Sequence, residues 1–212
     1  MISEMDLERI ENAANRMAEA TRFRKAIRSI DFLNDDDPKR VADEGRDIGY
    51  ELYFSRLLFA KTLSLDNDAS ESLLLAARAQ HVGRWKMPRS DFPMGRTGYL
   101  KWRSGLKRYH ATVAAEVLED AGYDSATIDH VRSINLKENL KSNPDAQTME
   151  DALCLVFLEV QFSEFRLKTS EEKMISILRK TWGKMSERGQ KATLALDLGE
   201  EESRLVGLAL AG

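Results

Sequence analysis

The sequence predicts an all-α fold, a single helical bundle of about seven helices, and three observations support this class. Apolar residues recur at three- and four-residue steps along most of the chain, which is the period of an amphipathic helix. No run shows the convincing period-2 alternation of a half-buried strand, and the Asn-Gly and Asp-Gly pairs typical of hairpins are absent. Residues that cap helices recur between the periodic segments.

The first half of the chain is expected to hold three helices. The first covers residues 5–32. The segment Asn34–Pro38 ends it and begins a second helix, to about Leu65, because acids favour a helix N-terminus and proline fits the first turn. Asp68, followed three residues later by Glu71, is typical of a capping box and opens a helix over residues 72–81. An irregular stretch with two prolines and three glycines follows at residues 82–98.

The second half is expected to continue as helices with recognisable ends. The helical period resumes at Tyr99 and stops at Gly122, a residue type favoured just after a helix. Asp124 or Ser125 caps the next helix, to about residue 140, and further helices start at residues 143–144 and 173. We expect one domain over residues 1–212, with a core at about 21–196 and a loosely held C-terminal tail at about 197–212.

Composition excludes several classes of protein. Hydrophobic residues make up 42% of the chain and charged residues 32%, as in globular proteins. A single cysteine, Cys154, excludes an internal disulfide framework and a multi-cysteine zinc site. The chain has no signal-peptide core and no apolar run near the ~20 residues of a membrane span. We therefore expect a cytoplasmic protein with no membrane partner.

A basic segment predicts an anion site. Residues 78–108 contain nine basic side chains and one acid, Asp91, for a net charge of +8. Arginine binds phosphate oxygens with two parallel hydrogen bonds, and tryptophan stacks on bases or guanidinium groups. The candidate substrate-binding residues are Arg78, Arg84, Arg89, Arg96, Arg103, Trp85 and Trp102. The alternative is an ion-pair network with the acidic helices. The chain has neither a P-loop nor a strand-linked GxGxxG motif.

Histidines and carboxylates on apolar helices form a second group of candidates. His81 and His110 lie on largely apolar helix faces, Asp151 directly precedes the run ALCLVFL, and Glu51 lies on a polar stripe. Such side chains on different helices of a bundle build metal sites, and this set suits Mn, Fe, Ni or Zn. The predicted ligands are His81, His110, Asp151 and Glu51. The alternatives are hydrogen-bonded interior histidines and a Glu51 that pairs with an arginine or faces solvent.

Several strings in the chain resemble one family. These strings are AARAQHVGRW, PRSDFP, RTGYLKWRSGLKRYHA, LKENLKSNPDAQTMEDALCLVFLE and EEKMISILRKTWGKMSERG. They are similar to a family catalogued only as a domain of unknown function, whose members are sometimes labelled glutamyl-tRNA synthetases. The resemblance covers roughly residues 23–196. The synthetase label has no support, because the chain lacks a βαβ pattern and the nucleotide motifs of that activity.

The order of elements also resembles a degenerate histidine–aspartate (HD) phosphohydrolase domain, a helical bundle that binds one or two metals and cleaves phosphate esters. The resemblance implies that Glu51 replaces the first histidine, that Gln80 and His81 replace the His-Asp pair, and that Asp151 is the last aspartate. It places His110 and Lys137 where some members carry additional histidines. The loss of the His-Asp pair implies that the fold is shared more closely than the chemistry.

The leading hypothesis is an HD-like, metal-dependent phosphohydrolase acting on a small phosphorylated ligand, in particular a nucleotide. His81, His110, Asp151 and Lys137 are its candidate catalytic residues, with a divalent metal that activates water. The alternative is a non-catalytic nucleotide- or RNA-binding helical module that uses the arginine-rich segment. A third reading is a helical interaction protein whose basic surface meets an acidic partner.

Overall fold

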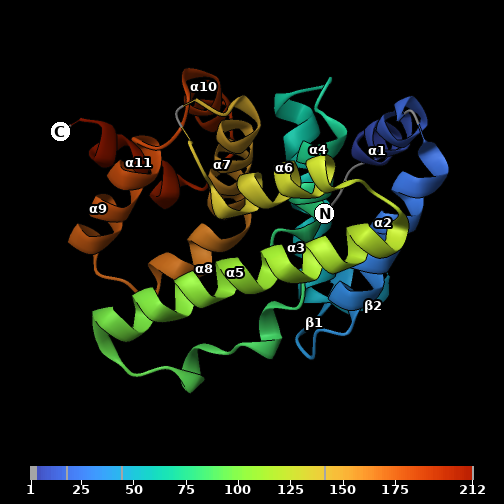
Figure 1. Ribbon diagram of the computed structural model, residues 1–212. Helices are drawn as coiled ribbons and strands as arrows, with labels where there is room; N and C mark the ends of the chain where they lie inside the picture. Colours follow the sequence, from blue (N-terminus) through green and yellow to red (C-terminus); the bar gives the residue numbers. More distant parts are fainter. Residues whose placement is uncertain (1–3, 18, 44, 141, 212) are drawn as a thin grey trace. The chain divides into compact units, whose positions relative to one another are not determined.

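The computed structural model describes residues 4–17, 19–43, 45–140 and 142–211, with eleven α-helices and one two-stranded sheet among them (Figure 1). The mainly helical structure confirms the all-α class that the sequence predicts, although the described helices outnumber the seven expected. The chain divides into two compact units, residues 1–146 and 147–212, and each is described by itself.

The first unit contains six helices and the sheet. Its elements are α1 (Glu4–Arg16), α2 (Ala20–Asp35), β1 (Arg40–Asp43), β2 (Arg46–Gly49), α3 (Tyr50–Leu65), α4 (Glu71–Ala79), α5 (Gly95–Ala121) and α6 (Ser125–Leu136). Two short 3₁₀ turns, η1 (Arg84–Lys86) and η2 (Arg89–Asp91), lie between α4 and α5. Two helices, α1 and α2, stand where one helix was expected over residues 5–32; residue 18 of that range lies outside the described residues.

The hairpin of β1 and β2 corrects the expectation of one helix over residues 38–65. The two strands pair antiparallel, with Val41 opposite Ile48. Gly45 has φ of +75°, a backbone conformation that glycine adopts without steric cost. At Gly49 the chain passes so close to the end of α2 that an added Cβ would lie 2.5 Å from the carbonyl oxygen of Asn34. Contact with α2 therefore holds this segment as a hairpin, and α3 begins only at Tyr50.

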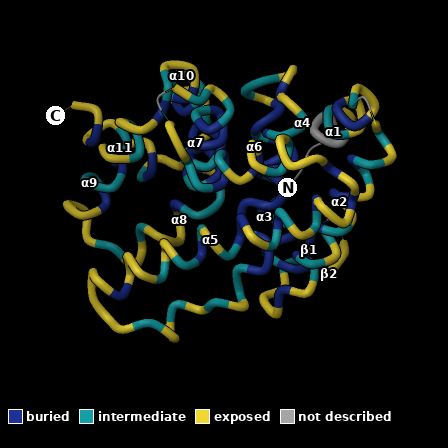
Figure 2. Tube along the Cα trace, in the orientation of Figure 1, coloured by how far each residue is buried: buried dark blue, intermediate teal, exposed yellow. Residues whose placement is uncertain are grey.

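The core of the first unit centres on α4. Residues 73–77 are 0% exposed, and the helix packs against α2, α3, α5 and α6. A helix that is apolar on all sides is stable only when neighbours surround it. The buried segments of α3 and α4 are dark blue in Figure 2, whereas the segment leading into α5 is mainly teal and yellow. The loop and the first turns of α5 thus remain accessible next to a buried core.

Local signals predicted several helix ends. Asp124 caps α6 by accepting a hydrogen bond from the Thr127 amide, and Gly122 ends α5 with φ of +93°. The cap of α4 is Ser70, which accepts from the Leu73 amide, and not Asp68 as expected. Helix α6 ends at Leu136, four residues before its expected end, because Lys137 adopts the left-handed conformation with φ of +57°.

The second unit is also helical, and it corrects the expectation of a loose tail. Its elements are α7 (Pro144–Val156, which begins in the first unit), the π-helical turn η3 (Phe157–Gln161), α8 (Phe162–Arg166), α9 (Glu171–Trp182), α10 (Glu187–Leu194) and α11 (Glu200–Leu210). Leu205 and Ala209 of α11 are buried against Met174 and Leu178 of α9. Burial of this apolar face holds α11 in place.

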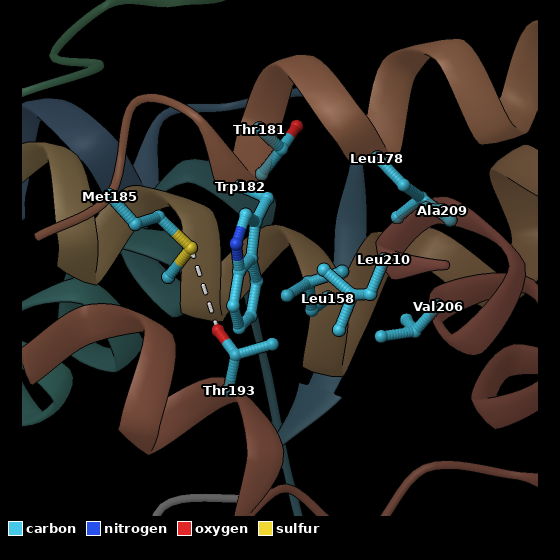
Figure 3. Close-up of a pocket in the computed structure, with 9 residues that line it drawn as sticks. All are labelled: Leu158, Leu178, Thr181, Trp182, Met185, Thr193, Val206, Ala209 and Leu210. Atoms are coloured by element: carbon cyan, nitrogen blue, oxygen red, sulfur yellow. Dashed lines mark hydrogen bonds between the residues drawn. The ribbon is translucent and has the colours of Figure 1, made fainter. Parts of the chain in front are cut away.

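A small hollow lies inside the second unit. Figure 3 shows the Trp182 ring between Met185 and Thr193 on one side and Leu158 on the other. The hollow has a volume of about 10 Å³, which can hold about one water molecule at most. The hollow is therefore a packing feature. None of the described helices is both long enough and apolar enough to cross a membrane.

Candidate functional site

The candidate site is an open cavity of about 300 Å³ in the first unit. The segment before β1, the first turn of α3, the loop after α4 and one side chain of α5 line it. The lining residues are Asp37, Lys39, Tyr50, Glu51, Arg84, Trp85, Met87, Pro88, Arg89 and Trp102. We call this cavity the Glu51 pocket, because a buried carboxyl group lies among three basic and three aromatic side chains.

Asp37 fixes the wall formed by α3. Its Oδ1 accepts a hydrogen bond from the Lys39 amide at 2.8 Å, and its Oδ2 accepts from the Glu51 amide at 3.1 Å. The Tyr50 amide donates to the carbonyl of Lys39 at 2.7 Å. The Lys39 ammonium lies 3.6 Å from the centre of the Tyr50 ring, a cation–π contact. The start of α3 and the hairpin thus place Lys39, Tyr50 and Glu51 together.

The opposite wall depends on close backbone contacts. Gly83 has φ of +65°, and an added Cβ there would lie 2.9 Å from the Tyr109 hydroxyl. This turn directs Arg84 and Trp85 into the pocket. Arg89 donates to the carbonyls of Phe92 and Pro93 at 2.8 and 2.9 Å, so it braces the loop that it belongs to. The indole N–H of Trp102 donates to the Met87 carbonyl at 2.9 Å.

Glu51 is the central group of the pocket and is only 5% exposed. Its Oε1 lies 3.6 Å from Nε of Arg84, and its Oε2 lies 3.4 Å from Nδ1 of His81. Oε2 accepts no hydrogen bond from the described residues. Burial raises the pKa of Glu51 to about 7, although the nearby Arg84, His110 and Lys39 side chains oppose the shift. A carboxyl group with this pKa exchanges protons readily at neutral pH.

Two histidines lie behind Glu51. The His81 ring stacks on Phe54 at 4.4 Å and lies 5.7 Å from the His110 ring, measured between ring centres. Nδ1 of His110 lies 2.9 Å from the Val82 carbonyl, which can only accept, so Nδ1 carries the proton. Nε2 of His110 is then a buried acceptor, and it has no hydrogen-bond partner among the described residues.

Both imidazoles are uncharged at neutral pH. Burial lowers the pKa of His110 to about 3, with the neighbouring His81 as a second cause and the bond to Val82 opposing the shift. Burial, followed by the charges of Arg84 and Lys137, lowers the pKa of His81 well below its usual range. Glu51 therefore faces a neutral ring on one side and a guanidinium on the other.

The structure distributes the predicted arginines among three environments. Arg84 and Arg89 line the Glu51 pocket together with Trp85 and Trp102. Arg78 is 5% exposed and forms two hydrogen bonds with Asp31, of 2.6 and 2.8 Å. Arg78 and Asp31 therefore form a buried ion pair, and Arg78 does not line the Glu51 pocket. Arg96 and Arg103 lie on the exposed first turns of α5.

Of the predicted catalytic residues, His81, His110 and Lys137 belong to the first unit and Asp151 to the second. The charge of Lys137 acts on His81, as its effect on the His81 pKa indicates. Asp151 is 0% exposed, and its Oδ1 accepts hydrogen bonds from the Ser186 amide at 2.9 Å and the Gln147 side chain at 3.0 Å. Its Oδ2 accepts from the Ser186 hydroxyl. Within its own unit, Asp151 holds the start of α10.

The predicted metal ligands do not form a donor cluster. Among the described residues no group of three or more His, Cys, Asp or Glu side chains is arranged to hold a metal ion. Glu51, His81 and His110 lie close together, but their side chains are not arranged as a metal-binding group. The metal site remains a prediction from the sequence.

Sequence reasoning missed five lining residues of the site, Asp37, Lys39, Tyr50, Met87 and Pro88, and Lys39 and Tyr50 carry the most weight in its chemistry. The segment that carries these two was expected to be helical, and the turn at Gly45 was the available signal for a hairpin. A second cavity of the first unit, of about 470 Å³, is lined by Arg28, Asp31, Phe32, Asp35, Asp36, Arg40, Leu52 and Arg56. Its charges balance, and it contains none of the buried unpartnered atoms found among the described residues.

Comparison with known proteins identifies the family. No curated protein and no solved structure matches the chain. A family model with the description Domain of unknown function (DUF4202) matches residues 24–206, which include every described residue that lines the Glu51 pocket. The chain therefore belongs to the DUF4202 family.

Proposed function

We propose that the Glu51 pocket binds a small phosphorylated ligand of the nucleotide class and that Glu51 transfers protons in the hydrolysis of its phosphate ester. One observation carries the proposal: a buried carboxyl group with a pKa of about 7 lies at a pocket that also presents Lys39, Arg84 and two tryptophans. The resemblance to HD phosphohydrolases that the sequence suggests for the segments around Glu51 and His81 favours the same reaction class.

The lining matches the two halves of a nucleotide. Lys39 and Arg84 supply positive charge for phosphate oxygens, and Trp85 and Trp102 supply flat apolar faces for a base. Arg84 is held 3.6 Å from Glu51 and 5.2 Å from the centre of the Trp102 ring. It therefore connects the phosphate half of the proposed site to the base half. Binding of a dianion next to Arg84 would raise the pKa of Glu51 further.

The hydrolytic step uses the carboxylate form of Glu51. Glu51 accepts a proton from a water molecule as the water oxygen forms a bond to phosphorus. The bond between phosphorus and the ester oxygen breaks, and its electron pair stays on that oxygen. The oxygen then takes the proton from Glu51, so the products are an alcohol and inorganic phosphate. Arg84 and Lys39 stabilise the negative charge that develops on the phosphoryl group.

The test is nucleotide binding by calorimetry and phosphate release by a colorimetric assay, on the full chain with a panel of nucleoside mono-, di- and triphosphates. Glu51→Gln keeps the shape of the side chain but cannot exchange a proton, so it should bind nucleotide and release roughly 100-fold less phosphate, the usual size of an acid–base contribution. Arg84→Gln should weaken binding roughly tenfold or more. Glu119→Gln, an exposed change on α5, is the matched control.

The alternative is a non-catalytic nucleotide-binding module, which the contact of Arg84 with Trp102 favours. It predicts tight binding with no phosphate release above background in either the wild-type chain or Glu51→Gln. Release that depends on Glu51 contradicts this alternative. Absence of any nucleotide binding contradicts both functions.

The divalent metal predicted from the sequence has a separate test. The metal content of the purified, untagged protein is measured by mass spectrometry beside that of His81→Ala. Near-stoichiometric Mn, Fe, Ni or Zn that is lost in the variant supports the predicted site. Phosphate release that persists after exhaustive chelation assigns the reaction to Glu51 and the basic residues alone.

A further inference from the structure

Two neighbouring aromatic rings, with a guanidinium group at each end, form a continuous series from the Glu51 pocket to the surface of α5. The Arg84 guanidinium lies 5.2 Å from the centre of the Trp102 ring, the Trp102 and Tyr99 ring centres are 5.9 Å apart, and the Arg103 guanidinium lies 5.8 Å from the centre of the Tyr99 ring. We call these four side chains the Arg–Trp–Tyr–Arg ladder. One end lies in the pocket and the other faces solvent.

The fold holds the inner part of the ladder and exposes the outer part. Trp102 is half-buried and bonded through its indole N–H to the Met87 carbonyl. Tyr99 is 42% exposed, and Arg103 is also exposed. An added Cβ at Gly98 would lie 1.8 Å from the Pro93 carbonyl oxygen, so the loop packs directly on the helix backbone there. The close approach leaves the neighbouring Tyr99 on the outer side of α5.

The stretch of α5 that carries the outer part of the ladder has basic but no acidic side chains. No acidic residue lies between Asp91 and Glu116 in the sequence, whereas Arg96, Lys101, Arg103 and Arg108 are exposed on α5. Arg96 and Lys101 form no ion pair with any residue that the structure describes. Clustered cations without counter-charges attract a polyanion and release its counterions on binding.

These observations point beyond a free mononucleotide, and we propose that the substrate is the phosphorylated end of a single-stranded nucleic acid. The inference rests on the proposed function of the Glu51 pocket. The terminal phosphate and base occupy the Glu51 pocket, with the phosphate beside Arg84 and the base beside Trp85 and Trp102. The next base stacks on Tyr99, and the backbone follows Arg103 and Arg96 along α5. Exposed aromatic rings beside arginines are the usual platform for unpaired bases.

The apolar side chains near the ladder fit this partner better than a membrane. Met94 and Leu100 are 90% and 53% exposed. They are six positions apart, with Arg96, Thr97 and Gly98 between them, so they do not lie one helical turn apart and do not form a continuous apolar face. Membrane-bound helices need a continuous apolar face that enters the acyl region. The first turns of α5 instead interleave basic, aromatic and small residues, as a stacking surface requires.

The test compares a nucleoside monophosphate with short oligouridylates that carry a phosphate at the 5′ end, at the 3′ end or at neither end, by fluorescence anisotropy and competition. The strand with the correct terminal phosphate should bind roughly tenfold more tightly than the mononucleotide, from one stacked base. Tyr99→Ala should abolish that gain and leave mononucleotide affinity unchanged, whereas Tyr99→Phe should retain the gain. DNA versions of the same strands report whether the 2′-hydroxyl contributes.

Salt dependence gives an independent readout. Arg103→Gln should lower the slope of log affinity against log salt by about one for the oligonucleotide. Arg132→Gln removes an exposed arginine of α6 and should leave that slope unchanged. Because both variants change exposed side chains, neither is expected to unfold the protein.

Three results overturn the inference. If the mononucleotide binds through Arg84 but the oligonucleotide has no advantage, the inference fails and the proposed function stands. If the strand binds regardless of its terminal phosphate, the pocket does not hold the strand end. If neither ligand binds but vesicles with phosphatidylserine bind in a Tyr99- and Arg103-dependent manner, both proposals fail and the surface belongs to lipid headgroups.

Discussion

Oε2 of Glu51 lies 3.4 Å from Nδ1 of His81, and burial keeps that imidazole uncharged at neutral pH. The carboxylate therefore has an uncharged neighbour on this side and the Arg84 guanidinium, at 3.6 Å, on the other. A buried charge with incomplete compensation costs free energy, which is the physical reason that Glu51 retains its proton up to about pH 7. Stability and acid–base function are thus coupled at this side chain.

Glu51→Gln should stabilise the protein at alkaline pH. The pKa of Glu51 is raised from 4.5 to about 7 on folding, so its favourable contribution is complete below pH 4.5 and is lost as pH rises through 7. Glutamine cannot ionise, so the variant does not lose stability as pH rises. Its free energy of unfolding should exceed that of the wild-type chain by near zero at low pH and by about 3 kcal/mol above pH 7. Urea unfolding across this pH range measures it. A constant difference at all pH values would contradict the raised pKa.

His110→Asn should make the protein less sensitive to mild acid. The pKa of His110 falls from 6.5 to about 3 on folding, so its contribution is complete above pH 6.5 and is lost as pH falls toward 3, where the unfolded chain binds a proton that the folded chain does not. The asparagine amide can still donate to the Val82 carbonyl. Thermal unfolding between pH 7 and 4 should show a smaller decrease for the variant.

Arg78→Gln should lower stability without changing ligand affinity. Arg78 is 5% exposed and bonded twice to Asp31, so the change leaves a partly buried carboxylate without its partner. Loss of one member of such a pair costs roughly 3 kcal/mol. Chemical unfolding measures the loss, and calorimetry on the folded protein measures nucleotide affinity. Arg132→Gln, an exposed arginine, should be close to neutral. Weaker nucleotide binding by folded Arg78→Gln would contradict this prediction and show that Arg78 contributes to the ligand site.

Asp151→Ala should destabilise the second unit and leave the Glu51 pocket intact. The carboxylate accepts hydrogen bonds from the Ser186 amide and hydroxyl and from Gln147, and truncation leaves these donors unpaired. The expected cost is about 2–4 kcal/mol, and Asp151→Asn should cost less because it keeps one acceptor. Hydrogen exchange resolved along the chain should locate the loss in residues 147–212. Loss of a bound metal together with loss of phosphate release would instead support the catalytic role predicted from sequence.

The sequence predicted the helical class and many helix ends because these depend on local chemistry. The cap at Asp124 and the left-handed glycine at Gly122 each act within one turn, so neighbouring residues decide them. The hairpin of β1 and β2 was not predicted, because strands of four residues are too short to show a clear alternation of polar and apolar residues. Contact with α2 decides whether this segment is helix or strand. The tail was misjudged for a related reason: Leu205 and Ala209 find their partners on α9, distant in sequence.

By itself, the sequence determined that the chain is helical, that residues 78–108 are strongly basic and that His81, His110 and Glu51 lie on apolar helices. Only the tertiary structure decided which of these charges act together. It buried Arg78 against Asp31, placed Arg84 beside Glu51, and left Arg96 and Arg103 in solvent. The reason is that a side chain's charge state and partner depend on burial and on residues far away in sequence, which the spacing of residues along one helix does not encode.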